Sequence, residues 1–133
     1  MRIGLYGLLT AVFMALPATA QEEPIQQTIQ NQLDAFRADD FARAFTFASP
    51  NIKTIFGSAE NFGAMVTEGY PMVNQPSAVT MLELREVAGN LWQRVMITDE
   101  AGRTHLLDYQ MIETAEGWQI NGVQLLQAPG IGA

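Results

Sequence analysis

A chain of 133 residues with 48% hydrophobic and 16% charged residues fits a single globular domain and disfavours disorder. Its formal net charge of −7 disfavours nucleic acid and anionic lipid as partners, because affinity for phosphate groups depends on clustered Lys and Arg. Cysteine is absent, which excludes disulfides, thiol chemistry and a lipidated cysteine, so stability must come from core packing.

Residues 1–20 have the pattern of a secretory signal peptide. Arg2 supplies a positive start, residues 3–16 are largely apolar, and Ala18-Thr19-Ala20 forms an A-x-A cleavage signal. An uncleaved membrane anchor is the alternative, but the apolar run is shorter than the roughly 20 residues that cross a bilayer as a helix. We therefore expect a periplasmic or secreted protein that has no membrane contact after signal cleavage.

Residues 21–127 form the expected domain, and its first half has helical periodicity. A first helix is predicted to begin at Pro24, which suits a first helical position. Its apolar stripe consists of Ile25, Ile29, Leu33 and Phe36. Asp39-Asp40 precedes a second helix. Because Asp is a preferred N-cap, we interpret these acids as a cap rather than a catalytic pair.

Two shorter helices are predicted to begin after Ser49 and Ser58, which are both capping residues. Gly57 is expected to end the first of them. Gly69 is expected to end the second in a left-handed conformation, with Pro71 preventing continuation. Residues 72–77 are then predicted to form a connecting loop.

From residue 78 onward the pattern changes to the alternation of strands, predicted at 79–86, 90–98, 104–113 and 118–126. Each connection ends in glycine, at Gly89, Gly102 and Gly117, which is typical of three-residue hairpin loops with a left-handed glycine. The sequence therefore predicts an antiparallel four-stranded meander, followed by a flexible tail at 128–133.

The hairpin loops also predict which residues face each other. If Asp99 faces Arg103, then Arg94 lies opposite Asp108, and opposite charges are paired. A slip of one residue would place Arg94 against Leu107 instead, which favours the first pairing.

In the last hairpin Thr114 is predicted to face Trp118, and both faces of the sheet are then apolar. One face has Leu91, Val95, Leu107, Tyr109, Met111 and Val123, and the other has Trp92, Met96, Leu106, Ile112, Trp118 and Ile120. A sheet that is covered only once normally has a polar outer face. We therefore expect either a sheet that curls around its helices or a homodimer formed through one sheet face.

Short motifs extend over nearly all of the chain that follows the signal: Asp39-Asp40, Ala44-Phe45-Thr46-Phe47-Ala48-Ser49-Pro50, Phe56-Gly57, Phe62 with Met65-Val66, Gly69-Tyr70-Pro71 and Gly117-Trp118-Gln119-Ile120-Asn121-Gly122-Val123. Together they resemble a bacterial family known as domain of unknown function 4864. Its order of helices and then sheet is similar to the nuclear transport factor 2-like (cystatin-like) superfamily. The resemblance implies an α+β fold, with N-terminal helices packed on a curled antiparallel four-stranded meander. It selects no function, because that superfamily includes isomerases, dehydratases, polyketide cyclases and non-enzymatic binding or dimerisation modules.

No metal, cofactor or nucleophile site is predicted. His105 is the only histidine, so a metal site would need carboxylates that converge from distant segments. Ser49 and Ser58 occupy cap positions, and neither lies in a Gly-x-Ser-x-Gly elbow.

Acid–base catalysis by Asp108, Tyr109 and His105, in a dry pocket closed by Phe36 and Tyr70, is the enzymatic hypothesis that the residues favour most. The predicted register points Asp108 away from the other two and toward its cross-strand partner, so a structural salt bridge is the preferred interpretation. An isomerase- or dehydratase-type enzyme is kept as the alternative function.

The preferred hypothesis is an exported, non-catalytic module that binds a small apolar ligand or self-associates. The residues predicted to line its cavity are the aromatic residues Phe36, Phe45, Tyr70, Trp92 and Tyr109, and no residue is assigned as catalytic. For any single one of them, ordinary core filling is the interpretation that we favour.

Overall fold

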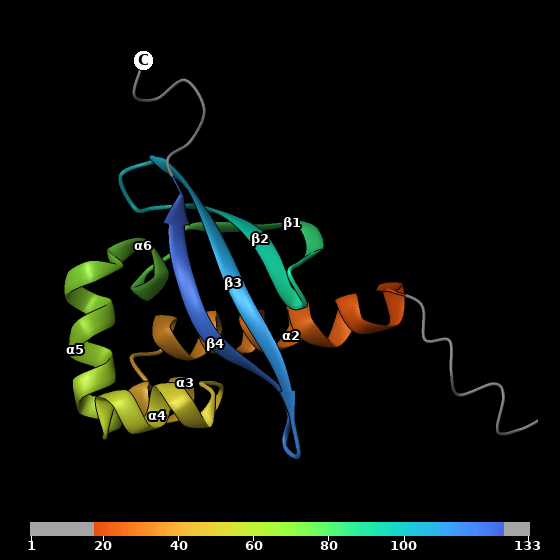
Figure 1. Cartoon of the computed structure of the whole chain (residues 1–133). Helices are drawn as coiled ribbons and strands as arrows, with labels where there is room; N and C mark the ends of the chain where they lie inside the picture. The colour runs from red at the N-terminus through yellow and green to blue at the C-terminus, as the bar shows by residue number, and fades with distance from the viewer. Residues whose placement is uncertain (1–17, 127–133) are drawn as a thin grey trace, which may run out of the picture.

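A four-stranded antiparallel sheet curls over a layer of helices in the computed structural model, which describes residues 18–126 (Figure 1). The helices come first in the chain and the strands follow. The predicted α+β fold class, with helices packed on a curled antiparallel meander, is therefore confirmed. The expected signal peptide, apart from residues 18–20, and the expected tail at 128–133 lie outside the described residues.

The helices of the described chain are α2 (Ala18–Arg37), α3 (Phe41–Thr46), α4 (Pro50–Phe56), α5 (Ala59–Gly69) and α6 (Pro71–Asn74). The prediction that the first of them begins at Pro24 is wrong, because α2 already includes the residues before it. Ala, Gln and Glu in that segment are strong helix formers, so the helix extends toward the N-terminus although Pro24 donates no hydrogen bond. No helix within residues 18–126 is both long and apolar enough to cross a membrane.

The predicted side-chain caps are present at three helix starts. The Asp40 carboxylate accepts a hydrogen bond from the backbone N–H of Arg43 at 3.0 Å, so this acid caps α3. Ser49 and Ser58 cap α4 and α5 in the same way. Gly57 ends α4 with a φ of 80°, in the left-handed region that favours glycine. These local signals divide the segment after α2 into short helices that can bend around the sheet.

The end of α5 differs from the prediction. Gly69 is the last residue of this helix and has no positive φ, and Tyr70 follows it with a φ of −136°. Pro71 then occupies the first turn of α6, so a helical turn lies where the first half of a loop was expected. A proline that ends one helix also suits the start of the next, and the sequence pattern does not separate the two roles.

The strands are β1 (Ala78–Val87), β2 (Asn90–Thr98), β3 (Thr104–Thr114) and β4 (Gly117–Leu126), in the spatial order β1-β2-β3-β4. The predicted meander is therefore confirmed. In the central hairpin the backbone N–H of Asp99 donates to the carbonyl oxygen of Arg103 at 2.8 Å, and Arg94 pairs with Asp108. The predicted register of this hairpin is confirmed as well.

The two outer hairpins have shorter loops than predicted. In the β1–β2 hairpin only Ala88 and Gly89 form the loop, with φ values of 53° and 84°. In the β3–β4 hairpin Gly117 already pairs with Thr114 instead of belonging to the loop. The prediction of three-residue loops is wrong at both. In the first hairpin Val87 still pairs with Asn90, and in the last Gly117 begins the strand, and the sequence pattern does not separate a residue at the end of a strand from one in the loop.

The shorter β3–β4 loop changes the face on which two residues lie. Trp118 pairs with Glu113, and Ile120 pairs with Met111, whose side chain is buried on the helix face. Trp118 and Ile120 therefore also belong to the helix face, and their predicted assignment to the other face is wrong. A shift of one residue moves every side chain of a strand to the opposite face.

The free edge of β4 is joined to the segment between α3 and α4. The N–H of Ile120 donates to the carbonyl oxygen of Phe47 at 2.9 Å, and the N–H of Ser49 donates to the carbonyl oxygen of Ile120 at 2.8 Å. Ala48 and Ile120 thus form a parallel bridge. This bridge fixes the position of the short helices beside the sheet and covers an edge that would otherwise be open.

Candidate ligand-binding cavity

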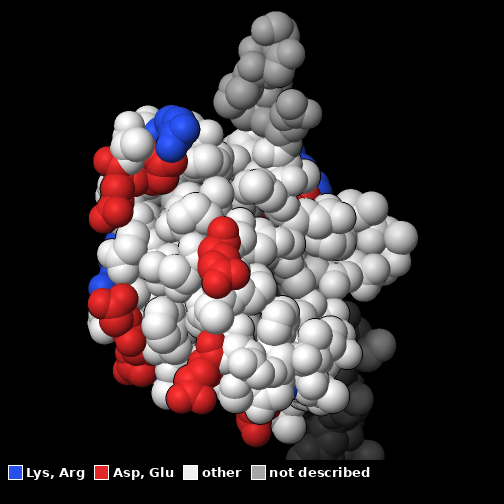
Figure 2. Space-filling model, turned by 90° about the vertical axis from the view of Figure 1, so that its left-hand side faces the viewer, with Lys and Arg blue, Asp and Glu red and all other residues white. Residues whose placement is uncertain are grey.

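A cavity of about 440 Å³ lies between the helical layer and β4. Its wall consists mainly of apolar and aromatic side chains: Ala48, Ile52, Phe56, Phe62, Met65, Val66, Tyr70, Val73, Ile120 and Val123, together with Gln32 and Gly122. Figure 2 views the molecule from the side of α5, where separated Asp and Glu side chains lie on a largely uncharged surface. The interior of the cavity therefore suits an apolar group better than an ion.

Phe62 of α5 is the centre of an aromatic cluster in this wall. Its ring centroid lies 5.9 Å from that of Phe36, 5.2 Å from that of Phe45 and 5.8 Å from that of Phe56. The adjacent Gly63 allows α5 to approach α3 closely, because a Cβ at this position would lie only 2.7 Å from the Phe41 ring. This packing holds α5 against α2, α3 and α4 and so fixes the shape of the wall.

Two lining residues have polar side-chain groups, Gln32 and Tyr70. Gln32 is only 3% exposed, and its Nε2 donates to the carbonyl oxygen of Ala44 at 3.1 Å. The lining includes no Asp, Glu, His, Lys or Arg side chain. Such a site can enclose and orient an uncharged molecule, but it offers no carboxylate or imidazole for proton transfer.

Of the aromatic residues predicted to line a cavity, only Tyr70 does so. Phe36 and Tyr109 are fully buried in the core, and Phe45 packs against this core. The structure thus brings these residues together on the helix side of the sheet, but most of them fill space instead of enclosing it.

Trp92 lies on the opposite face of the sheet. Its neighbour Gln93 pairs with Tyr109 on the helix face, and adjacent residues of a strand point to opposite faces. The sheet therefore separates Trp92 from the other residues predicted to line the cavity.

Most of the lining that sequence reasoning missed comes from the short helices. Ile52, Phe56, Met65 and Val66 have the spacing of apolar helix stripes, which predicts that they face a core. Whether facing side chains leave an open space depends on how the elements pack against each other, and no local pattern contains that information.

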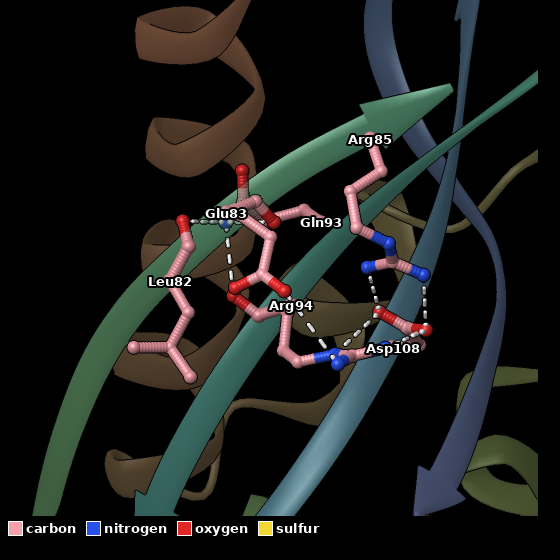
Figure 3. A network of polar contacts seen from close by, with 6 residues as sticks. All are labelled: Leu82, Glu83, Arg85, Gln93, Arg94 and Asp108. Atoms are coloured by element: carbon pink, nitrogen blue, oxygen red, sulfur yellow. Dashed lines mark hydrogen bonds and ion pairs between the residues drawn. The ribbon is translucent and has the colours of Figure 1, made fainter. Parts of the chain in front are cut away.

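Asp108 is the centre of a polar cluster on the outer face of the sheet, away from the helices (Figure 3). Arg85 donates to both carboxylate oxygens, at 2.9 and 2.8 Å, and Nη2 of Arg94 lies 3.1 Å from Oδ2. The pairing of Asp108 with Arg94 is confirmed, whereas the contact with Arg85 was not predicted. Burial raises the pKa of the Asp108 carboxyl, but the hydrogen bonds and charges of both arginines outweigh it and hold the pKa below its usual value.

The other two acid–base candidates lie in different surroundings. Nε2 of His105 is 2.9 Å from Oδ2 of Asp99 beside the central hairpin loop, and this hydrogen bond lowers the pKa of the Asp99 carboxyl. The Tyr109 hydroxyl is buried without a hydrogen-bond partner among the described residues, and burial raises its pKa. The three groups therefore do not meet in one site. Within residues 18–126 no cluster of His, Asp and Glu is arranged to hold a metal ion.

Fold and site together define an α+β domain in which a curled sheet and short helices border an apolar cavity. This is the architecture predicted from the nuclear transport factor 2-like resemblance. The chain belongs to the family described as domain of unknown function (DUF4864), whose model matches residues 18–133. The predicted family membership is confirmed.

Solved structures with a similar arrangement share little sequence with this chain. An NTF-2-like protein of unknown function from Burkholderia xenovorans LB400 is 15% identical, with a TM-score of 0.48 over 83% of this chain and 91% of that one. A phospholipid-binding protein from Ralstonia solanacearum, solved in complex with a phospholipid, is 12% identical, with a TM-score of 0.48 over 79% of this chain and 77% of that one. The intermembrane space region of the chloroplast protein ARC6 is 13% identical, with a TM-score of 0.47 over 86% of this chain and 99% of that one. No curated protein matches the chain.

Proposed function

We propose that this domain binds a small apolar molecule in the cavity between β4 and the short helices. The observation that supports the proposal is the cavity itself, with its volume of about 440 Å³ and its apolar lining. Protein interiors are close-packed, and few of their voids are larger than a water molecule. Sites for small molecules, in contrast, have volumes of roughly 300 to 1,000 Å³, mostly apolar walls and a few polar groups.

The volume also limits the size of the ligand. A volume of about 440 Å³ is near the lower end of the roughly 300 to 1,000 Å³ of ligand sites. A diacyl lipid is several times larger and would have most of its length outside. The ligand that fits is a compact molecule or one short chain.

Binding is better supported than catalysis because of where the titratable groups lie. Asp108 is bound to arginines on the outer face, and His105 is bound to Asp99 beside a hairpin loop. An acid–base enzyme needs such groups within reach of the substrate.

The binding proposal is tested by titrating para-propyltoluene, an uncharged molecule of suitable size, into residues 21–133. Chemical shifts of backbone amides in α4, α5 and β4 should change with saturation. Val123→Phe, which fills part of the cavity, should abolish this response. Leu125→Phe is the matched control on the same strand, because Leu125 is 49% exposed and does not line the cavity. Equal responses in both variants would contradict the proposal.

Self-association through the outer sheet face is the competing hypothesis from the sequence, and light scattering tests it. Trp92 and Met96 are partly exposed on that face. Arg94, which pairs with Asp108, lies between them on β2, so a charged cluster interrupts the apolar surface. A strict monomer at high concentration would contradict a homodimer.

Export to the periplasm or the cell exterior is supported by the signal-peptide pattern of residues 1–20. Expression of the full chain in a bacterium, followed by fractionation and N-terminal sequencing, should give a periplasmic protein that begins at Gln21. A full-length protein in the cytoplasmic fraction would contradict this location.

A further inference from the structure

Gln32 is the one lining residue that combines almost complete burial with a polar side chain. The residue is 3% exposed and lies on α2, beneath the cavity wall formed by the shorter helices. A buried side-chain amide normally has hydrogen bonds on both its oxygen and its nitrogen, because an unpaired polar group in an apolar site costs free energy.

The orientation of this amide is fixed by its one hydrogen bond. Nε2 donates to the carbonyl oxygen of Ala44 at 3.1 Å, and only the NH₂ end of the amide can donate to a carbonyl. Ala44 is itself fully buried, so water does not compete for this bond. Oε1 of Gln32 therefore points away from Ala44.

Oε1 has no hydrogen-bond donor among the described residues. Among the described residues, Oδ1 of Asn74 and Oη of Tyr109 are the side-chain atoms that are both fully buried and without a partner. Oε1 of Gln32 has no partner either, but it is not fully buried, so it faces an open space. For a residue that is 3% exposed and lines the cavity, this space is the cavity.

The chemistry of the lining sets what can use this acceptor. A ligand must donate a hydrogen bond to Oε1, so it needs an O–H or N–H group. It must also be uncharged, because the lining offers no charged side chain and a buried ion without a counter-charge is strongly disfavoured. Tyr70 is the second lining residue with a polar side-chain group.

We infer that the ligand class of this cavity is a neutral, compact molecule with one O–H or N–H group, such as an alcohol or phenol, which donates to Oε1 of Gln32 while its apolar part fills the space beside β4. This inference rests on the proposed function, since it assigns chemistry to the same cavity. It separates a hydroxyl-bearing ligand from a hydrocarbon of equal size and from an anion such as a fatty acid.

The test compares para-propylphenol with para-propyltoluene, which differ only by a hydroxyl in place of a methyl group, and with para-propylbenzoate as the anion. Calorimetric titration of residues 21–133 should show binding of the first two and at least tenfold weaker binding of the benzoate. Gln32→Met should weaken binding of the phenol by about tenfold, the factor expected for one buried hydrogen bond, and leave binding of the toluene unchanged. Equal effects on both ligands would overturn the inference.

Gln119→Met is the matched control. Gln119 is also a buried glutamine, but its amide bonds to Thr46, Thr114 and Glu116, and it does not line the cavity. This substitution should change neither affinity; a loss of phenol binding equal to that of Gln32→Met would overturn the inference.

A measurement on the unmodified protein covers the case in which Gln32→Met does not fold. The side-chain amide resonances of Gln32 should shift on addition of para-propylphenol and shift much less with para-propyltoluene. If para-propyltoluene binds but both ligands shift the Gln32 amide resonances equally, the inferred ligand class is wrong and the proposed function still holds. Absence of binding by both ligands would contradict the proposed function.

Discussion

Asp108 and Tyr109 are neighbours in the sequence, but they lie on opposite faces of β3, and only Asp108 has partners for its polar atoms. On the outer face the Asp108 carboxylate is held by two arginines, whereas on the helix face the Tyr109 hydroxyl has no partner among the described residues. The outer face is thus stabilised by paired charges. The helix face is stabilised by apolar packing, and this packing leaves a cavity. We infer from this difference that charge on this sheet is structural and that ligand binding belongs to the helix face.

Asp108→Asn should have the largest effect on stability. It leaves Arg85, about three-quarters buried, without its ion-pair partner, and it leaves Arg94, equally buried, with only Glu83 at 3.5 Å. We expect a loss of about 3 kcal/mol in the free energy of unfolding, measured by urea denaturation. Asp34→Asn is the control, because Asp34 is 51% exposed and pairs with Arg37 at the surface, where an ion pair contributes about 0.5 kcal/mol. Similar losses in both variants would mean that the Asp108 ion pairs stabilise the fold no more than a surface ion pair does.

Trp118→Ala and Trp92→Ala compare two partly buried tryptophans on the two faces. Trp118 packs against the core, so its truncation should cost about 2 kcal/mol, below the range for a fully buried ring. Trp92 on the outer face should cost about 1 kcal/mol or less. Thermal denaturation measures both losses. The reverse order would mean that the outer face, and not the helix face, has the tighter packing around its tryptophan.

The acid limb of the stability curve should report on the outer face. Because the pKa of Asp108 is lower in the folded state than its usual value, its ion pairs contribute fully above the unfolded pKa of about 3.9. This contribution is lost as the pH falls through the lower, folded pKa. The unfolding free energy should therefore decrease below about pH 4 in the unmodified protein and decrease less steeply in Asp108→Asn. Parallel acid limbs would show that other carboxyls dominate.

Tyr109→Phe should have the smallest effect, and it should be stabilising. It removes a buried hydroxyl that has no partner among the described residues and keeps the ring, which should raise the unfolding free energy by about 1 kcal/mol. Denaturation in urea measures the change. A loss of stability would mean that the hydroxyl is bonded in solution, and would bring Tyr109 back as a polar group of the helix side.

The candidate site was only partly predictable. The apolar stripe of residues 62–66 correctly indicated a buried helix face, and Tyr70, one of the residues predicted to line a cavity, lies in its wall. Gln32 gave no signal, because it lies between Asn31 and Leu33 on a helix whose other glutamines are partly or fully exposed. Its importance comes from the position of the carbonyl of Ala44, which a later helix brings to it.

The sequence by itself determined the features that depend on neighbours along the chain. These are the caps at Asp40, Ser49 and Ser58, the four strands, and the central hairpin with its pair of Arg94 and Asp108. Each depends on a few adjacent backbone dihedrals or on one short loop, so residue type is enough to favour one outcome.

The tertiary structure alone decided the face of Trp118, the approach of Arg85 to Asp108 and the existence of the cavity. A change of one residue in a loop exchanges the two faces of a strand, although the alternating sequence is the same for both. The contact of Arg85 needs β1 beside β2 with a bulge between Met81 and Leu84. The cavity is what is left where side chains from several helices and β4 do not fill the space between them, and that depends on the whole packing.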